Sequence, residues 1–150
     1  MVPNIFKGLA NSSVALGAFL KLDEMISQTS FTPVEQDIVK LVVRQYNECT
    51  YWLAAHTGSL SGQGLTSDEI VEFRKGKAED AKHAALINFT FKVLETKGHF
   101  SDGDIVAFKN AGFTDVHTAD LTVIIAQKTL SNLFNHINAT DLDLPAAPDI

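Results

Sequence analysis

The chain has 150 residues, one cysteine, a formal net charge of −6 and a hydrophobic content of 45%. One cysteine excludes an intrachain disulfide, a zinc site built on several cysteines and an internal Cys-x-x-Cys redox pair. The length fits one domain over residues 1–150, and the composition is that of a folded globular protein. The acidic balance disfavours nucleic acid and anionic membranes, so neither is expected as a partner.

No apolar segment approaches the ~18 uninterrupted residues that a membrane-spanning helix needs. The best candidate for a signal peptide is the run 13–20, but Lys21, Asp23 and Glu24 follow it closely and no small-residue cleavage site is present. An amphipathic helix is therefore the preferred interpretation of this run. A reducing, cytoplasmic location is expected.

The chain is predicted to be all-α, because strict apolar–polar alternation and hairpin turns between β-rich runs are absent. In the first half, apolar spacing predicts four helices, over about 5–9, 13–26, 33–46 and 48–59. The third begins at a strong start signal, in which Thr32 and Glu35 form a capping box around Pro33. Glycines from Gly58 to Gly64 are expected to end the fourth helix.

The second half predicts four more helices, over about 67–74, 79–97, 102–111 and 115–137. A capping box of Thr66 and Glu69 begins the first of them, and Ser101 caps the third. Apolar residues nearly surround the last helix, which is therefore expected at the centre of the fold or in a subunit interface. Residues 140–150 carry two prolines and are predicted to form an extended arm.

One segment of the predicted fourth helix carries residue types suited to chemistry. Cys49, Trp52 and His56 are spaced by three and four residues, which places them on one helix face. Cys49 is expected in the first turn, where the helix dipole and free N–H groups stabilise a thiolate. His56 lies about 10 Å further along the axis, so a water or a substrate would have to bridge the two. A buried cysteine, a core histidine and a packing tryptophan are the structural alternatives.

The segment resembles the signature of the alkylhydroperoxidase D-like and carboxymuconolactone decarboxylase family. That signature is an acidic residue, eleven residues, and then Cys-x-x-Cys-x-x-x-His. Here the acidic position is Asp37, the first cysteine is Cys49, the second is replaced by Trp52, and the histidine is His56. Similarity in the flanking segments 31–39, 65–70, 111–115 and 135–143 extends the resemblance over most of the chain and favours the peroxidase-related subgroup.

The resemblance implies a single-domain bundle of about seven to eight helices that forms a homo-oligomer, as a trimer or a hexamer. In the peroxidase branch, two cysteines form a redox pair while the acid and the histidine relay protons. With Trp52 in place of one cysteine that cycle cannot run. The first hypothesis is therefore a one-cysteine, thiol-dependent peroxidase of antioxidant defence. In it, Cys49 is oxidised to a sulfenic acid, Asp37 and His56 move protons, and an external thiol reduces the enzyme.

Two other hypotheses remain open. One is a decarboxylase-type lyase that acts through His56, with Asp37 retained beside it. An acidic lactone substrate would then need a basic residue, and the sequence places neither arginine, Arg44 nor Arg74, in the site. The other is a catalytically degenerate protein in which Trp52 and Tyr51 line a pocket for a small apolar or aromatic ligand. No metal or other cofactor is expected, because the remaining histidines lack metal-ligand spacing.

Overall fold

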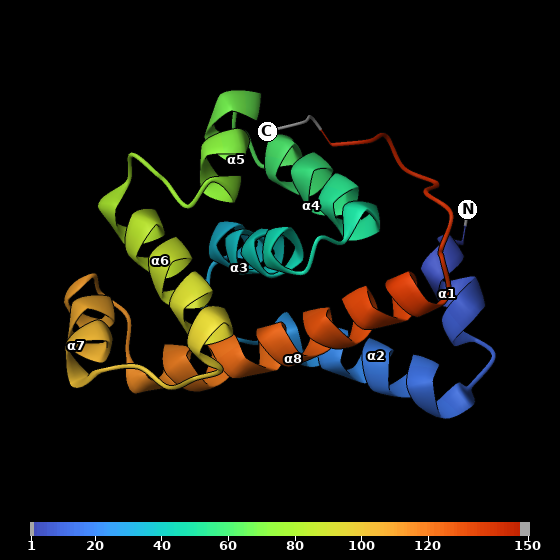
Figure 1. The fold of residues 1–150 in the computed structure, drawn as a ribbon, viewed down its shortest axis with the longest axis horizontal. Helices are drawn as coiled ribbons and strands as arrows, with labels where there is room; N and C mark the ends of the chain where they lie inside the picture. The colour runs from blue at the N-terminus through green and yellow to red at the C-terminus, as the bar shows by residue number, and fades with distance from the viewer. Residues whose placement is uncertain (1, 148–150) are drawn as a thin grey trace.

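The computed structural model describes residues 2–147, and this range contains eight α-helices and no β-strand (Figure 1). The helices are α1 (Asn4–Leu9), α2 (Ser13–Ile26), α3 (Pro33–Tyr46), α4 (Thr50–Gly62), α5 (Ser67–Arg74), α6 (Ala81–Thr96), α7 (Asp102–Asn110) and α8 (Asp115–Ile137). The predicted all-α fold class is thereby confirmed. None of these helices combines the length and the hydropathy that a membrane crossing requires.

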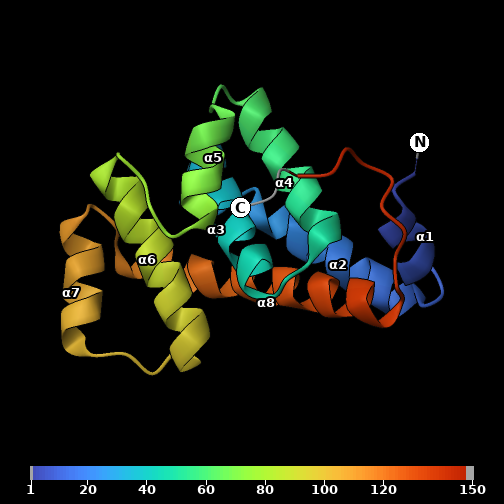
Figure 2. The same cartoon turned by 45° about the horizontal axis from the view of Figure 1, so that its top comes forward.

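Helix α3 lies at the centre of the fold, where α4, α5, α6 and α8 all pack against it (Figures 1 and 2). The outer helices are α2, which packs on α8, and α7, which packs on α6. Burial on all sides of α3 includes polar side chains as well as apolar ones, with Glu35, Asp37 and Arg44 among them. A central helix with buried charges requires partners for those charges from the helices around it.

Local capping sets the start of α3 as the sequence predicts. The Thr32 hydroxyl accepts the Glu35 backbone N–H at 3.3 Å, and the Glu35 carboxylate accepts the Thr32 backbone N–H at 2.8 Å. The same reciprocal pair forms between Thr66 and Glu69 at the start of α5. Each box satisfies two N–H groups that have no partner inside the helix.

The predicted bounds of the fourth helix are wrong at both ends. Glu48 has a φ of 56°, a left-handed conformation that interrupts an α-helix, so α4 begins only at Thr50. Cys49 is consequently the N-cap residue, with extended backbone, rather than part of the first turn. At the other end the helix continues through Gly58 to Gly62, and Leu60 in this last turn is fully buried.

Two apolar clusters flank the centre of the fold. The larger surrounds α3 and includes the residues Ile38, Leu41, Val42, Leu86, Ile87, Phe108 and Ile124. The smaller joins α1, α2 and the start of α4 and includes the residues Ile5, Leu9, Phe19, Cys49 and Tyr51, with Trp52 packed against it. The N-terminal segment thus covers the start of α4.

Contrary to what its sequence suggests, the last helix, α8, is not buried through apolar side chains on all sides. Its second half buries polar side chains, namely Gln127, Lys128, Ser131, Asn132 and Asn135. Leu133 and Ile137, on the same half, are exposed. Helix α8 packs against α3 and α2 through this polar face, so its burial does not depend on a second subunit. The homo-oligomer stays a prediction.

Residues 140–147 form neither helix nor strand and run from the end of α8 past α1 towards α4 (Figures 1 and 2). Asp143 fastens this tail, because its carboxylate accepts the backbone N–H of Asn4 at 2.8 Å and the hydroxyl of Tyr51 at 2.7 Å. The remaining part of the predicted arm, residues 148–150, lies outside the described residues.

Candidate functional site

A cleft of about 650 Å³ lies where α2, α3, α4 and α8 meet. Its lining combines aromatic side chains, namely Phe6, Phe19, Tyr51 and Trp52, with charged or polar ones, namely Asp23, Gln36, Asp37, Lys40, His56, Ser59, Gln63 and Lys128. Leu144 of the C-terminal tail also contributes. An apolar cleft with a few convergent polar groups is the usual form of a small-molecule site.

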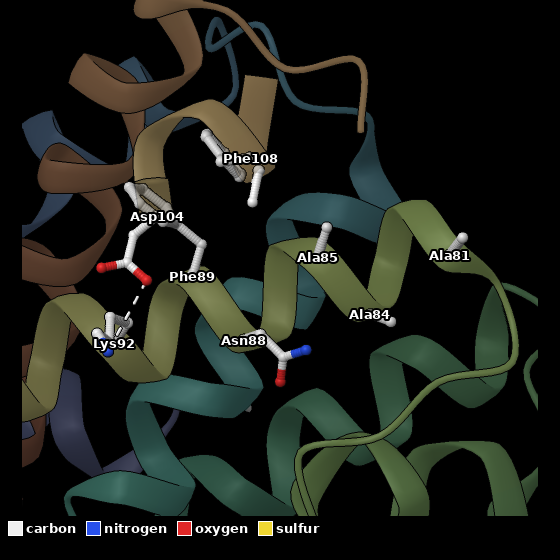
Figure 3. Close-up of a pocket in the computed structure, with 9 residues that line it drawn as sticks. Ala81, Ala84, Ala85, Asn88, Phe89, Lys92, Asp104 and Phe108 are labelled. Atoms are coloured by element: carbon white, nitrogen blue, oxygen red, sulfur yellow. Dashed lines mark ion pairs between the residues drawn. The ribbon is translucent and has the colours of Figure 1, made fainter. Parts of the chain in front are cut away.

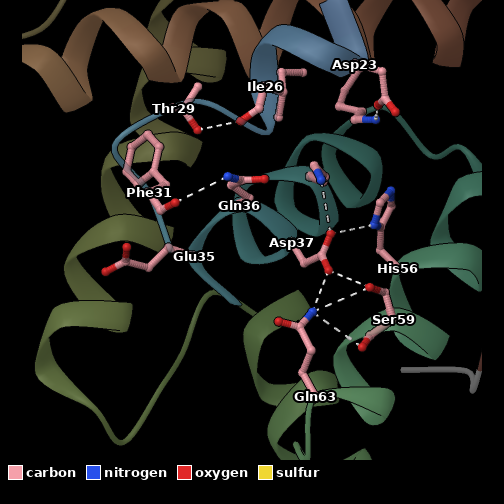
Figure 4. A network of polar contacts seen from close by, with 12 residues as sticks. Asp23, Ile26, Thr29, Phe31, Glu35, Gln36, Asp37, His56, Ser59 and Gln63 are labelled. Carbon is pink, nitrogen blue, oxygen red and sulfur yellow. Dashed lines mark hydrogen bonds and ion pairs between the residues drawn. The ribbon is translucent and has the colours of Figure 1, made fainter. Parts of the chain in front are cut away.

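The carboxylate of Asp37 is the centre of the polar side of this cleft. His56 Nδ1 lies 3.0 Å from its Oδ1, and Lys40 Nζ lies 3.3 Å from the same oxygen. Oδ2 accepts hydrogen bonds from the Ser59 hydroxyl at 2.5 Å and from the Gln63 amide at 2.7 Å (Figure 4). With four donors around it, the carboxylate is fixed in position.

Sequence reasoning found two members of this network and missed three. Asp37 and His56 were predicted as site residues, whereas Lys40, Ser59 and Gln63 were not. A signal for the last two exists, because positions 56, 59 and 63 share one face of a helix. It was obscured by the expectation that α4 ends near residue 59, which left Gln63 in a loop.

The hydrogen bond to Asp37 determines what His56 presents to a ligand. A carboxylate can only accept, so Nδ1 carries the proton, and in the neutral ring Nε2 is then the basic nitrogen. Nε2 is buried and has no hydrogen-bond partner within residues 2–147. A proton acceptor beside the cleft, held by a carboxylate on its other nitrogen, is the arrangement that general acid–base catalysis requires.

Aromatic rings form the opposite side of the site. The ring of Trp52 stacks on His56, with centroids 5.9 Å apart and 24° between the planes, and on Phe19 at 6.1 Å. Tyr51 contacts the edge of Trp52 at 5.6 Å. Burial, together with the hydrogen bond to Asp143, raises the pKa of Tyr51 to about 12. Its hydroxyl therefore anchors the tail as a neutral donor.

Cys49 is not among the residues that line the cleft. Its side chain is buried, packs in the cluster of α1 and α2, and accepts a weak hydrogen bond from Asn135 Nδ2 at 3.7 Å. Of the five predicted site residues, Asp37, Tyr51, Trp52 and His56 therefore line one cleft. Cys49 does not line it and is buried in the smaller apolar cluster, against which Trp52 packs.

Two buried cations were not predicted at this site. The Arg44 guanidinium lies 4.7 Å from the centroid of the Trp52 ring, and Lys128 Nζ lies 5.2 Å from the same ring. Arg44 is fully buried, and Lys128 is 2% exposed. A single charged residue in a helical sequence does not indicate that its side chain is buried. The one available signal was that position 44 shares a helix face with Asp37 and Lys40.

A second cavity of about 560 Å³ lies between α6 and α7 (Figure 3). Its lining is mostly alanine and phenylalanine, with an ion pair of 3.8 Å between Lys92 and Asp104. It contains no histidine or cysteine and no pair of side chains suited to proton transfer. Among residues 2–147, no group of three or more His, Cys, Asp or Glu side chains is arranged to hold a metal ion. The cleft around Asp37 is the candidate site.

The fold is that of alkylhydroperoxidase D-like proteins. An uncharacterized peroxidase-related protein from Silicibacter superposes with a TM-score of 0.84 at 20% identity, covering 94% of this chain and 76% of that one. A peroxidase-related protein from Ralstonia eutropha, described as an alkylhydroperoxidase AhpD core, gives 0.84 at 23% identity, with 97% and 78% covered. A protein of unknown function from Agrobacterium tumefaciens, provisionally described as an AhpD antioxidant defence protein, gives 0.78 at 18%, with 91% and 95% covered.

At these identities the structural likeness establishes the fold alone. Residues 15–96, more than half of the chain, match the model of the carboxymuconolactone decarboxylase family. The chain therefore belongs to this family. A comparison with curated proteins gave no match.

Proposed function

We propose that the cleft catalyses proton transfer on a small organic molecule, with His56 as the catalytic acid–base residue and Asp37 as the residue that positions it. The observation that carries this proposal is the 3.0 Å contact between His56 Nδ1 and Asp37 Oδ1, which leaves Nε2 without a partner beside the cleft. The family resemblance includes a decarboxylase branch that works through a histidine as well as a peroxidase branch, so family membership is consistent with this chemistry but does not by itself select it.

In the proposed reaction, Nε2 of neutral His56 removes a proton from the substrate. The imidazolium that results is stabilised by Asp37 through the Nδ1–H bond, and it returns the proton to the product. Ser59 and Gln63 act through Asp37, because both donate to its other oxygen. The Trp52 ring holds the imidazole plane by stacking.

The residue at position 52 favours this chemistry over a thiol relay. In the family signature the second cysteine occupies this position, one helical turn from the histidine. Here an indole ring stacks on His56 instead, so the group next to the histidine on α4 has no nucleophilic sulfur. A proton that leaves His56 must therefore pass to a molecule in the cleft.

A one-cysteine peroxidase at Cys49 is the second candidate. It is favoured by the position of Cys49 at the N-cap of α4, where free N–H groups gather, and by the N–H of Asn135 that points to Sγ. In this reaction the sulfur attacks the O–O bond of a hydroperoxide, which yields a sulfenic acid and releases an alcohol. One external thiol converts the sulfenic acid to a mixed disulfide and water, and a second thiol restores Cys49. The burial of Cys49 restricts such a substrate to a very small peroxide.

Two substrate panels with matched variants distinguish these functions. One panel holds small lactones and keto acids, and the other holds hydroperoxides with dithiothreitol as reductant. We expect turnover in the first panel, a loss of about 10²–10⁴-fold in His56→Ala, and no change in Cys49→Ser. His99→Ala, which removes an exposed histidine outside the site, is the matched control.

The opposite pattern would overturn the proposal. Hydroperoxide turnover that disappears in Cys49→Ser and survives in His56→Ala would assign the function to the second candidate. Ligand binding near Trp52 without turnover in either panel would assign a binding role to the cleft.

A further inference from the structure

Two basic side chains, Arg44 and Lys128, are buried next to Trp52. Arg44 comes from α3 and Lys128 from α8, two helices that pack directly on each other. Their side chains are fully buried and 2% exposed, respectively, and both lie within 5.2 Å of the centroid of one indole ring. Removing two like charges from water is costly, and their repulsion grows in a medium of low dielectric constant. Such a pair calls for negative charge nearby.

The chain supplies little of that negative charge. Asp23 Oδ1 lies 3.8 Å from Lys128 Nζ, but the Asp23 side chain is half exposed and also accepts a hydrogen bond from Gln127 at 3.1 Å. The carboxylate of Asp37 is already surrounded by its four donors. A thiolate at Cys49 would balance one charge at most, and the hydrogen bond to its sulfur comes from Asn135. Burial, with Arg44 and Lys40 nearby, lowers the pKa of Lys128 well below its usual value, so Lys128 needs a negative charge beside it to stay protonated.

Unpaired polar groups are present at this ring and on the buried face of α8. All three guanidinium nitrogens of Arg44 are buried without a hydrogen-bond partner among residues 2–147. Trp52 Nε1 is in the same condition, and so are both Nδ2 and Oδ1 of Asn132. Asn132 lies one turn after Lys128 on the buried face of α8. Buried polar groups are almost always paired, so the three free guanidinium nitrogens of Arg44 call for a partner outside residues 2–147 of the chain.

Water would satisfy the N–H groups but not the charges. We propose that Arg44 and Lys128 together bind a small monovalent anion next to Trp52. Lys128 lines the cleft and gives the anion its entrance. Arg44 does not line the cleft but lies fully buried against Trp52, and its planar N–H groups suit an anionic acceptor. The ligand is a free inorganic ion or the carboxylate of a molecule held in the cleft. This inference does not depend on the acid–base role of His56.

The fluorescence of Trp52 reports this site directly, because it is the only tryptophan of the chain. The full-length protein is titrated with sodium chloride or with sodium acetate, and sodium sulfate, a divalent anion outside the proposed class, keeps the ionic strength constant. We expect a saturable change in emission, in contrast to the linear response of collisional quenching. A preference for chloride identifies a free inorganic ion, a preference for acetate identifies a carboxylate, and either result supports the site.

Variants of Lys128 that keep or remove its charge distinguish a role in anion binding from a role in packing. Lys128→Met keeps the length of the buried side chain and should weaken anion binding at least tenfold, whereas Lys128→Arg should retain it. Lys92→Met, at a half-exposed lysine on α6, should bind as the natural protein does. His56→Ala should also retain the anion, so that loss of the proposed catalytic activity and loss of anion binding remain distinguishable. A linear response to both anions, or equal saturation in Lys128→Met, would overturn the proposal.

Discussion

The imidazole of His56 and the indole of Trp52 are stacked with their centroids 5.9 Å apart, and the hydrogen bond from Nδ1 to Asp37 holds the same imidazole by its edge. One contact fixes the plane of the ring and the other fixes its rotation in that plane. A base with both degrees of freedom restrained presents Nε2 in one direction, which lowers the entropic cost of proton transfer.

Asp37→Asn tests the positioning role of the carboxylate. The amide oxygen can still accept from one donor, but the negative charge that stabilises an imidazolium is lost. We expect activity to fall by about 10²–10⁴-fold. The Nδ1–H resonance of His56 in a proton NMR spectrum should move upfield, a change that mere loss of stability would not produce. Asp115→Asn, at an exposed aspartate, is the control. Unchanged activity and an unchanged resonance would contradict the role of Asp37.

Trp52→Cys recreates the spacing of two cysteines in the family signature. The substitution removes a partly buried ring from contact with His56 and Phe19, and a loss of about 3–5 kcal/mol in the free energy of unfolding is expected. With a thiol beside His56, we expect peroxide consumption in the presence of dithiothreitol to rise above that of the natural protein. Trp52→Ser creates a similar cavity without a thiol and should not gain activity. Equal rates in the two variants would show that the scaffold no longer supports a redox pair.

Cys49 is expected to react slowly in the folded protein. Its side chain is 2% exposed and covered by α1 and α2, so an alkylating reagent reaches it only when this region opens. Alkylation by iodoacetamide should therefore be much slower than that of a free thiol at the same pH and should accelerate in denaturant. Mass spectrometry measures both rates. Rapid alkylation of the folded chain would show that the sulfur is accessible and would strengthen the peroxidase candidate.

Tyr51→Phe tests the link between the tail and α4. The variant loses the hydrogen bond to Asp143, for which we expect a cost of about 1–2 kcal/mol near neutral pH. The pKa of Tyr51 is raised to about 12 from a usual value of 10. Above pH 10 the unfolded chain loses the phenolic proton before the folded one does, so this stabilisation should disappear between about pH 10 and 12. Denaturant unfolding across this range should show a steeper decline for the natural protein than for Tyr51→Phe.

The local features of the fold were predictable from sequence, because their signals lie within a few residues of each other. The capping boxes of Thr32 and Thr66 fix the starts of α3 and α5 in this way. The start of α4 was not predictable, because it depends on the left-handed conformation of Glu48, a residue type that rarely adopts it. The pairing of Asp37 with His56 followed from the family signature, since spacing alone does not show that α3 and α4 pack together.

The buried cations show where such prediction ends. Arg44 and Lys128 are far apart in the chain and come together only because α8 crosses α3 through its polar face. From local sequence patterns alone, an arginine after Val42 and Val43 would be interpreted as a helix boundary or as a surface residue. Burial of a charge is a property of the assembled helices, and the sequence holds no local mark of it.

The attachment of the tail at Asp143 has a consequence for selectivity. The following residue, Leu144, forms part of the wall of the cleft and belongs to a segment without helix or strand. One part of the cleft wall is therefore held by hydrogen bonds that Asn4 and Tyr51 donate to the tail, and not by the packing of helices. If the cleft binds a ligand as proposed, a change in the tail alone should alter the size of that ligand without changing the pair of His56 and Asp37.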